Sequence, residues 1–143
     1  MKNNVLAVFA VSCLVAALST PVFAQSLRIE ANIPFEFVAG GKTLTAGEYS
    51  VANSTTPGTL TIRNESNQEG AMVISHAVQA SPTSSSFQAK LVFHRYGNQY
   101  FLAQVWGGYD SFGRQLPTTR NERAASESAA LRQPEEVVIL ARR

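Results

Sequence analysis

Apolar side chains recur at every second position along most of this chain, and turn residues interrupt the pattern every few positions. The stretch 27–33 is the first example, with apolar Leu27, Ile29, Ala31 and Ile33 between polar Arg28, Glu30 and Asn32. A period of two is that of a β-strand with one buried face, whereas a helix needs a period near 3.6. Short strands separated by frequent turns are typical of antiparallel sheets. The pattern therefore predicts an all-β fold.

The same pattern continues beyond Pro34, which interrupts a β-ladder and so marks an edge or a change of partner. Apolar alternation or short apolar runs predict further strands, and Gly40-Gly41 and Ala46-Gly47 predict turns; the strands expected are near 35–39, 49–51, 59–63, 71–78, 87–93, 100–106 and 137–141. The last of these is a continuous apolar run, which is typical of a strand covered on both sides. The segments 53–58, 64–70 and 81–86 are expected to be loops because of their polar, Pro, Gly and Ser content.

One helix is expected near the C-terminus. Thr119 is a good N-cap, and Glu122 stands three residues later, as in a capping box. The helix should run from residue 120 to 131 and lie flat on a sheet, because its apolar content is mostly alanine; Pro134 ends it. Roughly eight strands and one helix predict an antiparallel β-sandwich, or a small closed barrel, as a single domain over residues 25–143.

The clearest hairpin spans residues 87–106. Pairing Phe93 with Phe101 places one apolar set on a common surface, namely Phe87, Ala89, Leu91, Phe93, Phe101, Ala103 and Val105. This register leaves residues 95–99 to make the reversal, with Gly97 and Asn98 tolerating positive φ. The opposite face then carries a mixed set of side chains: Gln88, Lys90, Val92, His94, Tyr100, Leu102, Gln104 and Trp106.

Residues 1–24 have the features of an export signal. Lys2 precedes the apolar run 5–18, and the small-residue ending places cleavage between Ala24 and Gln25. The run is too short to span a bilayer comfortably, so we expect it to be removed and no membrane span to remain. A lipoprotein would use Cys13 as its processing site, but the preceding Ala-Val-Ser lacks a leucine-like residue. The protein is thus expected in the periplasm or outside the cell.

The only cysteine of the chain, Cys13, lies inside this predicted signal, so the exported domain must fold without disulfides. Without Lys2, eleven basic residues face ten acidic ones. The basic residues are scattered, with no stripe that could follow a phosphate backbone, and we expect no nucleic-acid partner.

A resemblance to a known group of proteins accompanies these patterns. Residues 35–51 contain the element F-x-F…G-x-x-L-x-A-G-x-Y-x-V, and residues 91–97 read Leu-Val-Phe-His-Arg-Tyr-Gly. Both segments resemble a family of small exported bacterial β-domain proteins that carries no assigned reaction or ligand, and the similarity covers most of residues 25–143. The Gly-x-Tyr-x-Val ending also resembles one edge of transthyretin-like sandwich modules. The resemblance implies a shared fold and nothing about chemistry.

Catalytic and metal motifs are sparse. A hydrolase or metal-dependent enzyme would have to use His76, His94 and Asp110, yet no Gly-x-Ser-x-Gly elbow is present to expose a serine. Met72 and His76 would share a strand face as soft copper ligands, but two histidines fall short of a closed zinc site. We expect Met72 in the core, His76 at the surface and His94 stacked on Tyr100, with no cofactor and no catalysis.

The strongest binding candidate is the mixed hairpin face, formed by Lys90, His94, Tyr100, Gln104 and Trp106. Aromatic rings beside amides can stack on sugars or hold a protein partner. In the alternative interpretation, the C-terminal helix covers this face and the rings form its core. We therefore expect a non-catalytic exported β-domain that binds polysaccharide or an envelope protein, or is structural. The other functions considered are the enzyme above and a small barrel carrying an apolar ligand.

Overall fold

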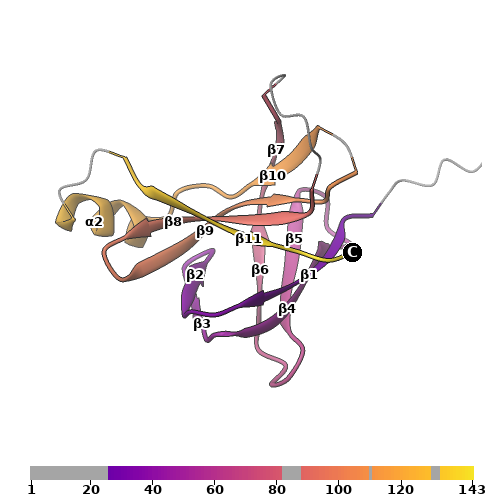
Figure 1. The fold of residues 1–143 in the computed structure, drawn as a ribbon, viewed down its shortest axis with the longest axis horizontal. Coiled ribbons are helices and arrows are strands. Elements are labelled where there is room, and N and C mark those ends of the chain that lie inside the picture. Colours follow the sequence, from indigo (N-terminus) through magenta and orange to yellow (C-terminus); the bar gives the residue numbers. More distant parts are fainter. Residues whose placement is uncertain (1–25, 82–87, 110, 130–132) are drawn as a thin grey trace, which may run out of the picture.

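A computed structural model describes residues 26–81, 88–109, 111–129 and 133–143 (Figure 1). Over these residues the chain is a β-sandwich of two packed sheets with one helix near the C-terminus, α2 (Arg120–Ser128). The predicted all-β fold with a late helix is confirmed, and the strands form two sheets instead of one closed barrel. The predicted signal, its Ala24–Gln25 cleavage site, most of the serine-rich loop and Asp110 lie outside the described residues.

The first sheet is antiparallel throughout, and the period-two pattern forms it directly. Its strands, in spatial order, are β1 (Arg28–Ile33), β4 (Gly47–Asn53), β5 (Thr59–Asn64) and β6 (Gly70–Ile74). Along β1, exposed and buried residues alternate strictly, as the sequence predicts. The buried side chains of this sheet point to the second sheet and form one side of the core.

The second sheet contains the hairpin at its centre. Its spatial order is β11 (Glu135–Leu140), β8 (Lys90–Tyr96), β9 (Gln99–Trp106), β10 (Phe112–Gln115) and β7 (His76–Gln79). The short strand β2 (Phe37–Ala39) runs parallel to β9 through one pairing, Val38 with Phe101, and pairs with β3 (Lys42–Leu44). An antiparallel bridge between Glu30 and Arg142 links β1 to the end of the chain beside β11.

The F-x-F element is part of the core between the sheets. Its side chains Phe37, Leu44, Tyr49 and Val51 are all at most 1% exposed. The Phe37 ring contacts Tyr49 and Phe93 edge-on, at centroid distances of 5.1 and 5.4 Å. The buried Tyr49 hydroxyl donates a hydrogen bond to the Thr45 carbonyl at 2.7 Å, which satisfies its polar end. The element therefore has a packing role.

The predicted single strand 71–78 is wrong: the segment forms β6 in the first sheet and β7 in the second. The chain changes sheets at Ser75, which is 3% exposed and whose N–H donates to the Gly58 carbonyl at 2.8 Å. Met72, expected in the core, is 65% exposed on β6. Strand β10, which pairs with β7 and β9, was not expected from the sequence.

The predicted hairpin register is also wrong. Phe93 lies opposite Leu102, and Phe101 lies opposite His94, because the turn contains only Gly97 and Asn98. Farther along, Val92 pairs with Gln104, so Ala103 is an extra residue in a β-bulge. Phe93 consequently points into the core between the sheets, whereas Phe101 points to the outer side and packs with Tyr96 and Ala125.

This shift has a physical reason. The two-residue turn, with Gly97 at φ +61°, is tighter than a five-residue reversal. The bulge then lets three consecutive apolar residues of β9, Phe101, Leu102 and Ala103, all be buried at 5% exposure or less. Burial on both faces of one strand outweighs the strict alternation on which the predicted pairing rested.

The prediction that the strand 137–141 is covered on both sides is wrong as well. Strand β11 is at the edge of its sheet, with Val138 and Leu140 exposed by 47% and 60%. The start of the helix is confirmed, since Thr119 is the N-cap and its hydroxyl accepts a hydrogen bond from the Glu122 N–H at 3.2 Å.

The turn at Gly40-Gly41 offers a matched test of the packing. Both glycines have positive φ, +58° and +87°. A Cβ on Gly40 would approach Val73 Cγ1 to 2.6 Å, whereas a Cβ on Gly41 would meet nothing within 4 Å. We expect Gly41→Ala to cost about 1 kcal/mol from backbone strain and Gly40→Ala about 1–3 kcal/mol more, because Val73 is in the core. Urea unfolding of the two variants measures the difference, and equal costs would contradict this packing.

Candidate functional site

Four of the five predicted binding residues lie on the outer face of the second sheet, and one does not. Lys90 pairs with Trp106, and Trp106 pairs with Gly113; one position along, Val92 pairs with Gln104. Tyr100 lies on the inner side, where its ring stacks on Phe35 at a centroid distance of 3.9 Å. The bulge in β9 explains the position of Tyr100. Without the bulge, Tyr100 would lie on the same face as Trp106, but the extra residue between them turns it to the inner side.

The part of this outer face next to Trp106 has two rows of side chains, one per register position across the strands, and most of them are exposed or partly exposed. We call it the Trp106 face; its rows are Leu140, Lys90, Trp106, Gly113 and Val78, and then Val138, Val92, Gln104, Gln115 and His76. Neither row contains a carboxylate. The charged or titratable side chains in it are Lys90 and His76, so any net charge of the face is positive.

Trp106 is held in a fixed position at the centre of these rows. Its indole N–H donates to Gln104 Oε1 at 3.0 Å, and the Lys90 Nζ lies 5.7 Å from the ring centroid. The ring lies directly against Gly113, since a Cβ there would be 2.7 Å from two of its carbon atoms. Trp106 remains partly exposed. A side chain fixed by its neighbours loses little conformational entropy when a ligand binds.

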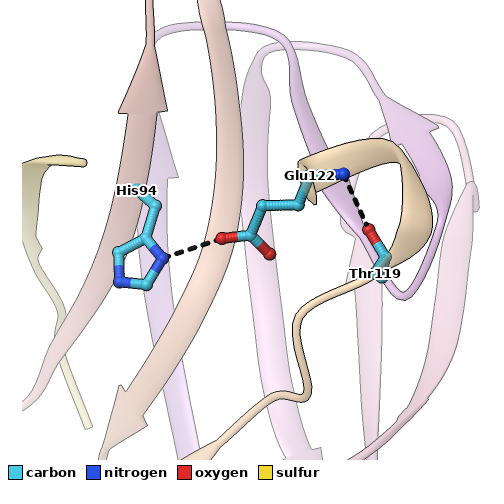
Figure 2. Close-up of polar contacts among 3 residues, drawn as sticks. All are labelled: His94, Thr119 and Glu122. Carbon is cyan, nitrogen blue, oxygen red and sulfur yellow. Dashed lines mark hydrogen bonds and ion pairs between the residues drawn. The ribbon is translucent and has the colours of Figure 1, made fainter. Parts of the chain in front are cut away.

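Helix α2 covers only the far end of the outer face. It buries Ala125 against Tyr96 and Phe101, and it places the Glu122 carboxylate beside His94 (Figure 2). The distance from His94 Nδ1 to Glu122 Oε1 is 2.8 Å, and the Glu122 side chain is 6% exposed. The alternative interpretation, in which the helix covers the whole mixed face, therefore holds for Tyr96 and His94 but not for Trp106.

The contact between His94 and Glu122 contradicts one prediction for each residue. The sequence predicts that His94 stacks on Tyr100, but His94 contacts Glu122, with the Tyr96 ring edge-on at 6.5 Å. Only the hydroxyl half of the predicted capping box forms at Thr119, because the Glu122 carboxylate turns to the sheet (Figure 2). The sequence signal for this contact was weak: a glutamate in an alanine-rich helix is usually solvated.

The hydrolase or metal hypothesis gains no support from the described residues. His76 and His94 are on strands three positions apart in the sheet, about 14 Å at ordinary strand spacing. The third residue, Asp110, lies outside the described part of the chain. No group of three or more potential metal ligands (His, Cys, Asp or Glu) gathers among the residues that the structure describes. Met72 and His76 are in different sheets, which removes the predicted shared strand face.

Comparisons with protein-family models, with curated proteins and with solved structures give no match. The resemblance of residues 35–51 and 91–97 to a family of exported proteins therefore stays a prediction. In the part of the chain that the structure describes, no helix has both the length and the apolarity needed to cross a bilayer.

Gly113 provides a test of how Trp106 is positioned. A methyl group at residue 113 would overlap the indole ring, and the ring must then leave its place. We expect Gly113→Ala to shift the tryptophan emission to longer wavelength and to make it more accessible to acrylamide, with a stability loss of about 1–3 kcal/mol. Gly41→Ala is the control, since a Cβ there meets nothing within 4 Å and its turn lies outside the hairpin that carries Trp106. Unchanged emission in Gly113→Ala would contradict the contact.

The raised pKa of Tyr96 predicts a loss of folding stability at alkaline pH. Burial raises the pKa of its phenol above the usual 10.0, and the nearby Glu122 carboxylate adds to the shift. The folded state thus holds the proton more tightly than the unfolded state. This contribution to stability is complete below pH 10.0 and is lost as the pH rises through the higher pKa of the folded state.

We expect the urea midpoint of the protein to fall between pH 8 and about pH 10.5, and to fall less in Tyr96→Phe. Tyr109→Phe, which leaves Tyr96 in place, should keep the full decrease. An identical alkaline loss in all three proteins would contradict the assignment to Tyr96.

Proposed function

We propose that this chain is an exported, non-catalytic β-sandwich that binds polysaccharide through the Trp106 face. The observation that carries the proposal is the position of Trp106. It is partly exposed at the centre of two rows of side chains that helix α2 leaves uncovered, and Gln104, Lys90 and Gly113 fix it there. Export rests on the signal-like sequence of residues 1–24.

The chemistry of the face suits a sugar ring. An indole presents a flat apolar surface that packs on the C–H face of a pyranose, as aromatic side chains with polar surroundings do at binding surfaces. Gln104 and Gln115 lie in the adjoining row and supply amide groups for hydroxyls. Val138 and Leu140, exposed at the margin, extend the apolar surface along β11.

The charge of the face favours an acidic polysaccharide over a neutral one. Lys90 and His76 are the ionisable groups in the two rows, and no carboxylate opposes them there. Glu136, paired with His94, is one register position farther out. Exposed charges of this kind contribute modestly to affinity and are weakened by salt, so binding should be stronger at low ionic strength.

Direct binding tests the proposal. Purified protein is titrated calorimetrically with polygalacturonate, as the acidic polysaccharide, and with a neutral β-glucan; the emission of Trp106, the single tryptophan of the chain, is a second readout for proteins that retain it. We expect saturable binding of the acidic chain. Trp106→Ala should weaken it by about tenfold or more, the scale on which a central aromatic contact contributes to binding. Lys90→Gln should weaken it less and reduce its dependence on salt.

The exposed Met72 of the first sheet gives the control, because Met72→Ala removes an apolar side chain that is more accessible than Trp106 and lies in the other sheet. It should bind as the unmodified protein does. If neither polysaccharide binds, or if Trp106→Ala binds normally, the proposal is wrong. Capture of a defined envelope protein that needs Trp106, without any glycan, would replace the polysaccharide by a protein partner.

A further inference from the structure

A pocket lies between the two sheets, on the inner side of the second sheet. It is on the opposite side of that sheet from the Trp106 face. Its volume is about 190 Å³. Residues at the ends of both sheets line it, and those that matter for its chemistry are Leu27, Asn53, Val105, Tyr109, Phe112 and Arg114. Most of the wall is apolar, one residue is cationic, and none of the lining residues is acidic. The small-barrel hypothesis would need a larger cavity, since pockets for drug-sized ligands measure about 300–1,000 Å³.

Arg114 gives this opening its chemical character. The side chain is partly buried on β10, and its Nε–H donates to the hydroxyl oxygen of the buried Ser75 at 3.1 Å. That bond fixes the guanidinium at the point where the chain crosses between sheets. Among the described residues, the ion pairs that form involve other cations, and no carboxylate neutralises Arg114. A partly desolvated, positioned guanidinium favours binding of an anion.

Two aromatic side chains at the mouth of the opening define the rest of the ligand. Tyr109 and Phe112 are 45% and 55% exposed, which is high for such rings. A second guanidinium, that of Arg143, lies 4.2 Å from the Tyr109 ring centroid and donates to the Gly108 carbonyl. The Tyr109 ring therefore combines exposed apolar surface with a neighbouring guanidinium, and the Phe112 ring adds further exposed apolar surface. A flat apolar body carrying one negative charge would match both.

We propose that this opening binds a small aromatic carboxylate, with its ring among Leu27, Tyr109 and Phe112 and its carboxylate on Arg114. The volume agrees with one ring, since an apolar protein cavity of about 150 Å³ holds benzene. The site does not depend on the proposed glycan binding. Trp106 projects from the opposite face of the same sheet, so loss of one activity leaves the other measurable.

Benzoate is the probe, and benzyl alcohol is its neutral counterpart of similar shape. Calorimetric or NMR titration of the protein should show saturable benzoate binding with a Kd on the order of 1 mM, as expected for so few ligand atoms. Benzyl alcohol should bind at least about tenfold more weakly, because it cannot form the charge-assisted bonds to Arg114.

Two variants and two controls decide the location. Arg114→Gln and Phe112→Ala should each weaken benzoate binding about tenfold or more. Arg63→Gln and Met72→Ala, which alter exposed side chains of the first sheet, should bind normally. If Arg114→Gln fails to fold, Phe112→Ala decides. No saturable binding, equal affinity for both probes, or normal binding by a folded Arg114→Gln or Phe112→Ala would overturn the proposal.

Discussion

Packing of the β8–β9 hairpin against the first sheet is the interaction on which the remaining structure depends. Phe93, Leu91 and Val105 are completely buried there, in contact with the strands of the F-x-F element. Burying a large apolar side chain contributes about 1.5–3 kcal/mol, and no disulfide adds to it in residues 25–143. The outer face of the same hairpin carries Trp106 at one end and the surface covered by α2 at the other.

The bulge at Ala103 connects the core to the candidate site. It lets β9 bury Leu102 toward the first sheet and Phe101 toward α2, while Gln104 and Trp106 remain in register on the outer face. The same irregularity turns Tyr100 inward, onto Phe35. A bulge is often found where a strand must redirect side chains for function, and here it separates the surface covered by the helix from the uncovered one.

The helix and the sheet depend on one buried ionisable contact. Glu122 is almost fully buried, and its carboxylate needs a partner because an unpaired buried charge is costly. His94 provides it, and Tyr96 lies alongside with a raised pKa. Without this contact, α2 would rest on Ala125 and a few neighbours only, since most of its surface is small or polar. The position of the helix, and so the border of the Trp106 face, rests on the contact of Glu122 with two side chains of β8, His94 and Tyr96, which are distant from it in sequence.

The sequence alone determined the elements whose signals are local. Period-two alternation defined β1, Gly40-Gly41 defined a turn, Thr119 defined the start of the helix, and the content of short strands defined an all-β fold, with a sandwich and a small barrel both open. Tertiary structure decided the features that depend on contacts between residues distant in sequence. The tight turn at Gly97 and burial on both sides of β9 set the hairpin register, and the crossing at Ser75 split one apparent strand between two sheets. Alternation in the sequence shows which side chains of a strand share a face. Which other element covers that face depends on the apolar area that the whole fold buries, and a single segment of sequence does not contain that information.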